Sequence, residues 1–314
     1  MPTSTDLPRI PYNRASSIEW PTILLAAVIY GGWLGLTFCW AAFPWWLLVP
    51  LAAWTVAWQG SLQHEVIHGH PTRSRAINDA IGWPPISLWL PYPLYKLTHL
   101  HHHRDEHLTD PLDDPESFYF THDNWHTLPR WLQLTLRFNQ TLVGRLLVGP
   151  AFMIGFFLFG EARLVIAGTD RRRAIWLAQA AGVAVVLTWV IGVCGMPLWL
   201  YLLAFVYAGG ALTRIRSFAE HRFAEAKEER TAIVERGGPL GLLFLNNNLH
   251  VLHHLRPTVA WYDLPELYRG HRQSLVEHNG GLVYRSYADV FRRFLLRPHD
   301  KLLHPHHRTT GPNE

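Results

Sequence analysis

The chain has 314 residues, of which 49% are hydrophobic, 13% aromatic and 17% charged. The charged fraction is well below the roughly 25% of a typical soluble domain, and the apolar content excludes a disordered chain. The two cysteines, Cys39 and Cys194, lie inside apolar stretches, which excludes a disulfide framework and cysteine-ligated metal sites. A net charge of +4 would suit nucleic-acid binding, but the placement of the charges argues against it.

Two long stretches with few or no charges predict membrane spans. No Lys or Arg lies between Ala15 and Thr72, and no charged residue lies between Ala174 and Thr213. The apolar part of each stretch is about twice as long as one membrane-crossing helix of roughly 20 residues, and Pro44 and Pro197 mark a turn within each. We therefore predict two helical hairpins in a single all-α integral membrane domain formed by residues 1–314. The predicted spans are residues 20–42, 44–63, 174–194 and 197–214.

The basic residues set the expected orientation. Both predicted turns lack Lys and Arg, so all 28 basic residues lie on the side that holds both chain ends. The positive-inside rule places that side in the cytoplasm. We expect an inner-membrane protein of a bacterium, with residues 64–173 and 215–314 forming a helical cytoplasmic cap. Within the cap, the 15 apolar residues of 146–160 are short for a span and are predicted to lie along the membrane surface.

Histidines are the most informative residues, and three groups of them have helical spacing. Residues three or four apart lie on one face of a helix, so each group presents its imidazoles together. Neutral imidazole is the commonest metal ligand among side chains. Eight such nitrogens exceed the needs of one four- or six-coordinate ion, so the pattern predicts two metals. The groups are His64 and His68; His99, His102 and His103; and His250, His253 and His254.

The same helical geometry separates ligands from neighbouring histidines. At about 100° per residue, His101 lies about 200° from His99, nearly on the opposite face of the helix. His101 is therefore predicted to face away from the metal. His70 lies about 240° from His64 by the same reckoning and is predicted to tolerate substitution.

One local motif suggests a different chemistry. Residues 64–68 read His-Glu-Val-Ile-His, which matches the HExxH pattern in which two histidines bind zinc and the glutamate is the general base. A zinc intramembrane protease would explain the position beside a span, but it would leave the other two histidine groups without a purpose. A solvated polar helix face would explain one group, but not three beside predicted membrane boundaries.

The order HxxxH, HxxHH and HxxHH across two hairpins resembles the membrane-bound fatty acid desaturase and hydroxylase superfamily, over roughly residues 20–290. Further matches are DPES at 114–117, RSFAEH at 216–221 and NNL at 247–249. The resemblance implies a non-haem di-iron centre that uses O2 and two electrons to oxidise an unactivated C–H bond. The iron ligands that it implies are His64, His68, His99, His102, His103, His221, His250, His253 and His254.

Other residues are expected to support these ligands. Related acyl-CoA desaturases place an Asn one turn before the histidine that matches His221, and Ser217 stands there in this chain. Hydrogen bonds from outside the ligand set commonly orient metal-bound imidazoles. The candidates for this role are Glu65, Asp114, Glu220, Asn247 and Asn248, with helix capping or backbone clamping as the alternative for the two asparagines.

The substrate and the electron source are expected to come from outside the chain. The sequence has no cysteine cluster, nucleotide fingerprint or fused cytochrome domain, so a ferredoxin, rubredoxin or cytochrome-type donor is expected to dock on the basic cytoplasmic face. A long-chain lipid or acyl substrate is expected, and no nucleic acid. The RSFAEHR and NNLHVLHH stretches favour a desaturase. A related hydroxylase or ketolase that acts on an alkane, a carotenoid or another lipid is the alternative.

We predict that reporter domains fused at Pro44 and at Gly195 lie on the side of the membrane opposite the cytoplasm, whereas reporters at Arg130 and at the C-terminus are cytoplasmic. The reason is the absence of Lys and Arg from both turns. Paired alkaline phosphatase and fluorescent-protein fusions measure this. A cytoplasmic reporter in either turn would contradict the two-hairpin topology.

Overall fold

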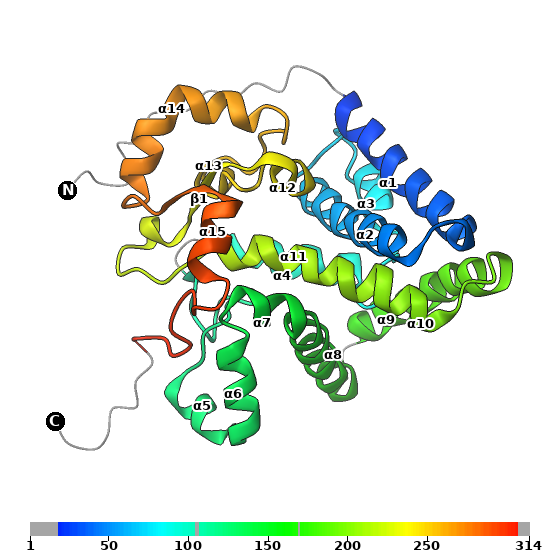
Figure 1. Cartoon of the computed structure of the whole chain (residues 1–314), viewed down its shortest axis with the longest axis horizontal. Helices are drawn as coiled ribbons and strands as arrows, with labels where there is room; N and C mark the ends of the chain where they lie inside the picture. Colours follow the sequence, from blue (N-terminus) through cyan, green and yellow to red (C-terminus); the bar gives the residue numbers. More distant parts are fainter. Residues whose placement is uncertain (1–17, 104–106, 169, 307–314) are drawn as a thin grey trace. The chain divides into compact units, whose positions relative to one another are not determined.

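The computed structural model describes residues 18–103, 107–168 and 170–306 (Figure 1). This part of the chain is mostly helical, with one two-stranded sheet and four helices long and apolar enough to span a membrane, which confirms the predicted helical membrane class. The two-hairpin arrangement and the cytoplasmic cap stay predictions. Both chain ends, predicted to be cytoplasmic, lie outside the described residues. The chain divides into two compact units that alternate along the sequence. We call residues 17–97 and 146–215 the membrane unit, and residues 1–16, 98–145 and 216–314 the histidine unit.

The membrane unit contains the long helices. Its elements are α1 (Trp20–Phe38), the 3-10 turn η1 (Trp40–Ala42), α2 (Trp45–Ile67), α3 (Arg75–Gly82), most of α4 (Tyr92–His102), α8 (Gly149–Ala167), α9 (Asp170–Leu187), the π-helical turn η3 (Thr188–Val193), α10 (Leu198–Tyr201), the π-helical turn η4 (Leu202–Tyr207) and most of α11 (Ala208–Ala219).

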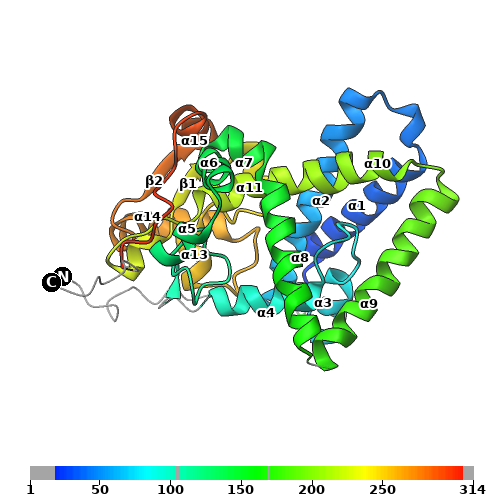
Figure 2. The ribbon, with the colours of Figure 1, turned by 90° about the horizontal axis from the view of Figure 1, so that it is seen from below.

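The histidine unit contains shorter elements, together with the last turns of α4 and α11 (Figure 2). They are α5 (His122–Thr127), α6 (Arg130–Phe138), α7 (Leu142–Leu147, whose last residues belong to the membrane unit), the 3-10 turn η5 (Lys227–Arg230), β1 (Ile233–Arg236), α12 (Gly238–Leu243), α13 (His250–Leu255), α14 (Leu264–His278), β2 (Val283–Ser286) and α15 (Tyr287–Phe294).

The four helices that are long and apolar enough to span a membrane differ in part from those expected. They are Trp20–Phe38, Gly149–Ala167, Asp170–Val193 and Leu198–Ala219. Helix α2 has 23 residues, but its four tryptophans, with Pro50 and Gln59, make it less apolar than these four.

Helix α8 is longer than the surface helix predicted for residues 146–160. The apolar run ends in the sequence at Glu161, but the helix continues to Ala167 through good helix formers such as Ala162, Arg163 and Leu164, and α9 supplies partners for the Glu161 carboxylate. Arg172 Nε and Trp176 Nε1 donate to Glu161 Oε2 at 2.8 and 3.1 Å. Gly168 then adopts a left-handed conformation (φ 88°) and ends α8, a geometry that favours glycine. The ion pair between neighbouring helices could not be read from the apolar run alone.

Buried polar contacts fix the core of the membrane unit. Trp33 Nε1 of α1 donates to the Tyr201 hydroxyl of α10 at 3.0 Å, and this hydroxyl donates to the Ile86 carbonyl at 2.6 Å. Around them pack apolar side chains from α1, α2, η3 and η4, including Leu48, Val190 and Phe205. Because a buried indole or phenol needs a partner, this chain of hydrogen bonds holds the loop at Ile86 against the helices.

The sheet of the histidine unit positions the third histidine group. β1 and β2 are parallel, with Ile233 opposite Val283. Val234 of β1 donates its N–H to the Asn248 carbonyl at 2.8 Å. Ile233 also packs with Leu252 of α13. The strand therefore holds both the start and the apolar face of α13, the helix that carries His250.

We predict that Gly209→Ala destabilises the protein by about 1–3 kcal/mol, the usual cost of overpacking. A Cβ atom at Gly209 would lie 2.8 Å from Val56 Cβ of α2, and neither atom can rotate away. Thermal unfolding in detergent measures the loss. The control is Gly32→Ala in α1, where no heavy atom would lie within 4 Å of the added Cβ and alanine favours the helix. Equal melting temperatures for the two variants would contradict the close packing of these helices.

Candidate metal centre

Seven of the predicted ligands lie in the histidine unit and form two neighbouring groups. His99 and His102 lie on the last turn of α4 and are buried, and His103 follows them. His250, His253 and His254 lie on α13 and are also buried. His221 follows α11 and forms an isolated bridge with Thr231. The rings of His103 and His254 stack with centroids 4.4 Å apart, which places the two groups side by side.

The first group consists of His102, His221, His250 and His254, whose ligand atoms all lie within 4.8 Å of one another. His221 Nε2 lies 3.0 Å from His102 Nε2 and 2.9 Å from His250 Nε2, and His254 Nε2 lies 3.2 Å from His250 Nε2. The Nε2 atoms of four imidazoles therefore converge on one small volume.

The opposite nitrogens of these rings show what this volume can accept. His102 Nδ1 lies 2.8 Å from Asp114 Oδ1, and His221 Nδ1 lies 3.3 Å from the Arg230 carbonyl. His250 Nδ1 lies 3.3 Å from Asn247 Oδ1 and 3.4 Å from Glu220 Oε1. In these three rings Nδ1 faces an oxygen acceptor, which favours the tautomer with the proton on Nδ1, so in the neutral ring Nε2 presents a lone pair.

A bound cation fits this arrangement. When all three rings are neutral, their converging lone pairs repel one another at separations of about 3 Å unless a positive charge lies between them. Two nitrogens bound to one ion at about 2.1 Å, at right angles, are roughly 3.0 Å apart. The distances among His102, His221 and His250 match that spacing. These residues therefore suit a metal ion.

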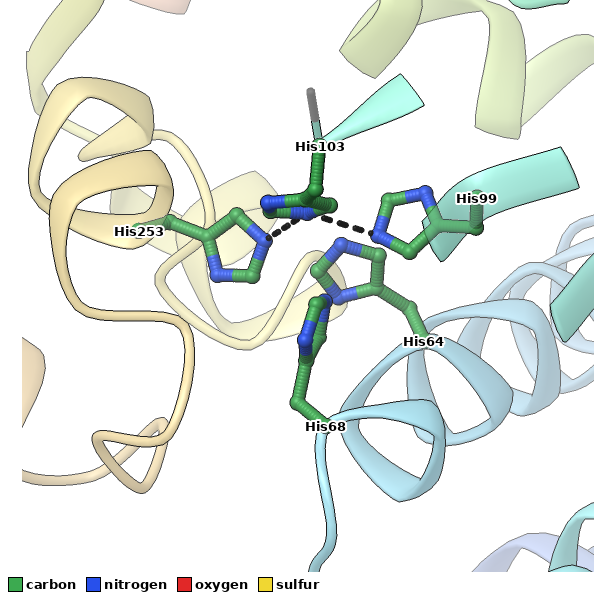
Figure 3. A group of neighbouring side chains, drawn as sticks. All are labelled: His64, His68, His99, His103 and His253. Atoms are coloured by element: carbon green, nitrogen blue, oxygen red, sulfur yellow. Dashed lines mark hydrogen bonds between the residues drawn. The ribbon is translucent and has the colours of Figure 1, made fainter. Parts of the chain in front are cut away.

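The second group in the histidine unit is formed by His99, His103 and His253. His103 Nε2 lies 3.0 Å from His99 Nε2 and 3.1 Å from His253 Nε2, as the dashed lines in Figure 3 show. His99 Nδ1 is directed to Glu116 Oε1 at 2.9 Å. Because Glu116 accepts a hydrogen bond from Nδ1–H, the neutral His99 ring also directs its Nε2 lone pair toward its group.

His64 and His68 lie in the membrane unit, at the end of α2. His64 is buried in the last turn and His68 caps the helix, with ring centroids 5.1 Å apart (Figure 3). Helical spacing thus brings these two imidazoles together, as predicted for residues four apart.

His70 differs from its prediction. The helix ends at Ile67 and Gly69 has φ 98°, so the helical angle does not extend to this residue. His70 is buried, with Nδ1 at 2.8 Å from Glu19 Oε1 and Nε2 at 3.8 Å from Glu65 Oε1. His70 was predicted to tolerate substitution. Its environment argues against this, because substitution would leave the buried Glu19 carboxylate without this donor. Glu65, predicted to orient a ligand, has its Oε1 atom 3.8 Å from His70 Nε2, and its role beside the ligands stays a prediction.

Burial and charge keep most of the ligands neutral. Burial, followed by the neighbouring imidazoles, holds the pKa of His99, His221 and His250 well below its usual value. Burial also acts to lower the pKa of His102, but Glu116 and Asp114 outweigh it and raise that pKa to about 9. Metal ligands must be deprotonated. A metal ion bound to His102 would interact favourably with Glu116 and Asp114, the two carboxylates that otherwise favour protonation of this ring.

The other predicted supporting residues have distinct environments. Asn247 Nδ2 donates to Glu220 Oε1 at 2.8 Å, and Arg216 Nε lies 3.1 Å from the same oxygen. Burial raises the pKa of Glu220 to about 7, and Arg216 acts in the opposite direction. Asn248 instead donates to the Val234 carbonyl at 2.7 Å. Asn248 Nδ2 therefore holds the backbone of β1 rather than a ligand. This is the backbone-clamping role that was the alternative for Asn248.

Glu116 is a supporting residue that the sequence analysis did not identify as such. Its Oε1 contacts His99 Nδ1, and its Oε2 lies 4.0 Å from His102 Nε2, so this one side chain lies beside both groups. The side chain of Glu116 is 31% exposed; partial desolvation opposes ionisation, but His102 and Arg216 hold the pKa of Glu116 below its usual value. The DPES stretch placed an acidic residue near the ligands, but the loop after α4 decides which histidine it contacts.

A helical membrane protein with two clusters of converging imidazoles is the class that this fold and site define. A model of the fatty acid desaturase family matches residues 40–288. The chain belongs to the fatty acid desaturase family, whose members are oxidoreductases. The chloroplastic omega-6 fatty acid desaturase of Spinacia oleracea is 23% identical to it over 305 residues, which cover 88% of this chain. The match covers 63% of that relative, less than two thirds of its length.

We predict that His102→Ala removes bound metal, whereas His101→Ala retains it. His102 is buried among the converging nitrogens and His101 is exposed one residue away on the same helix. Metal content of the two purified variants, measured by inductively coupled plasma mass spectrometry, tests the prediction. Metal loss in His101→Ala with His102→Ala unaffected would assign the site to the opposite face of α4.

Proposed function

We propose that this protein is an O2-dependent di-iron fatty acid desaturase that introduces a double bond into a long acyl chain of a lipid or thioester. The observation that carries the proposal is the convergence of Nε2 atoms from rings whose Nδ1 atoms face oxygen acceptors. Family membership supports the same reaction class. Imidazole is a suitable ligand for iron.

We assign the nine histidines to two irons. His102, His221, His250 and His254 would hold one. His99, His103 and His253 would hold the other, and we propose that His64 and His68 complete its ligand set. Bound iron would supply the redox chemistry needed to remove two hydrogens from adjacent methylene groups with O2 and two external electrons.

The protein's own residues perform the positioning in this proposal. Asp114 and Glu116 accept the Nδ1–H groups of His102 and His99, which fixes the tautomer and the ring orientation. Asn247 and Arg216 hold Glu220 beside His250. Burial of most of these imidazoles excludes water from the reacting centre, which protects a reactive oxidant from side reactions.

The remaining components follow from the chemistry. The substrate is a long apolar chain that reaches the site from the bilayer. The electrons come from a ferredoxin, rubredoxin or cytochrome-type donor on the cytoplasmic side of a bacterial inner membrane.

We predict that the purified protein carries about two irons per chain and that cells expressing it accumulate lipids with a new double bond. Iron analysis and gas chromatography–mass spectrometry of fatty acid methyl esters test this, with His102→Ala as the inactive control and His101→Ala as the matched active one. A new hydroxyl or keto group in place of the double bond would instead assign the chain to the hydroxylases or ketolases. One zinc, no iron and cleavage of a membrane peptide would support the HExxH protease.

A further inference from the structure

Helix α6 of the histidine unit carries an exposed apolar stripe. Trp131, Leu134 and Phe138 are 67%, 57% and 40% exposed, whereas Leu136 on the opposite side is 3% exposed. Spacings of three and four residues place the exposed side chains on one face. The helix therefore buries Leu136 in its own unit and presents three apolar side chains outward.

Two further exposed apolar side chains lie on a segment that runs beside the residues following α6. Leu295 and Leu296, directly after α15, are 46% and 73% exposed. The backbone after α15 runs along the segment that follows α6, because Val143 N–H donates to the Leu295 carbonyl at 3.1 Å and His299 N–H donates to the Gln140 carbonyl at 2.8 Å. Both views show α7 next to α6 (Figures 1 and 2), and the two hydrogen bonds place the end of α15 beside the segment that joins α6 to α7. We call the exposed side chains of Trp131, Leu134, Phe138, Leu295 and Leu296 together the α6 patch.

Exposed arginines flank the α6 patch in the sequence. They come from both ends of α6 and from the region of α15, and they are Arg130, Arg137, Arg292, Arg293 and Arg297. Asp289 pairs with Arg292 and Arg293, but the side chain of Arg292 remains 85% exposed. The flanks of the patch are therefore strongly basic.

The chain links the α6 patch closely to a membrane-spanning helix. The candidate span α8 begins at Gly149, eleven residues after α6 ends at Phe138. Part of this connection is helical, as α7, and rises only about 1.5 Å per residue there. A short, partly helical connection of the chain therefore leads from the α6 patch into a helix that is long and apolar enough to contact lipid.

We propose that the α6 patch inserts into the cytoplasmic interface of the bilayer, with its apolar side chains at the acyl boundary and its arginines at anionic phosphate groups. Amphipathic helices with tryptophan and leucine on one face and arginines beside them bind membrane surfaces in this way. The aliphatic stems of arginine can lie along the apolar layer while the guanidinium groups reach the head groups.

A lipid surface fits the α6 patch better than the electron donor does. An acidic donor would pair with the arginines, but transient redox complexes bury small interfaces, which would leave much of the apolar stripe in water. The bilayer satisfies both the apolar and the charged groups. The proposal goes beyond the reaction and does not depend on it, and it implies that the donor docks on another face of the histidine unit.

The test places a fluorophore on the patch in the full-length protein. Cys39 and Cys194 are replaced by serine, and Leu134→Cys is labelled with an environment-sensitive dye. The matched control is Gln273→Cys, an exposed position on α14 of the same unit. In vesicles of phosphatidylcholine and phosphatidylglycerol, brominated lipids should quench the dye at 134 at least about twofold more than at 273, and aqueous iodide should show the opposite order.

Equal quenching by iodide at the two positions would overturn the proposal. So would a dye at 134 that becomes shielded from iodide only when an acidic iron–sulfur protein is added, because that result assigns the patch to a protein partner. If Leu134→Cys does not fold, as judged by thermal unfolding, Trp131→Cys gives the same comparison. None of these readouts depends on catalytic turnover, so failure of the desaturase assignment would leave the result interpretable.

Discussion

The site depends on one constraint, which is that each imidazole offers its partners a proton on one nitrogen and a lone pair on the other. The Nδ1–H groups of three imidazoles have oxygen acceptors outside the cluster. Asp114 accepts from His102, Glu116 from His99, and the Arg230 carbonyl from His221. The lone pairs on Nε2 are then directed inward. Such an arrangement is unfavourable without a cation and favourable with one, so the oxygen acceptors outside the cluster determine what the cluster can bind.

The fold provides this arrangement with short and separately anchored pieces of chain. The second histidine group occupies the end of α4, and the third begins α13, which β1 holds through the Val234–Asn248 hydrogen bond. His221 follows α11 and pairs with Thr231. Because every group lies at or next to the end of a helix, a small displacement of any helix would separate the Nε2 atoms. Close packing, as at Gly209 and Val56, restricts such displacements in the membrane unit.

Membrane attachment involves more of the chain than the first apolar runs indicate. Helix α8 is a candidate span by its length and composition, and its one acidic residue, Glu161, is paired with Arg172 and accepts a hydrogen bond from Trp176. Helix α6 is polar on average, yet it exposes Trp131 and Leu134 on one face. For α6, the distribution of apolar side chains around the helix, rather than its average composition, indicates that one face suits lipid.

The sequence by itself determined the membrane class and the three histidine groups, because hydropathy and the period of the helix act locally. Helical angles correctly placed His99 and His102 inward and His101 outward. The same reasoning did not extend to His70, because α2 ends before it and Glu19 binds it. Which imidazoles share an ion, the contact of Glu116 with His99, and the role of Asn248 in holding β1 were decided only by tertiary structure. These contacts join residues from different elements, and no local rule of spacing specifies them.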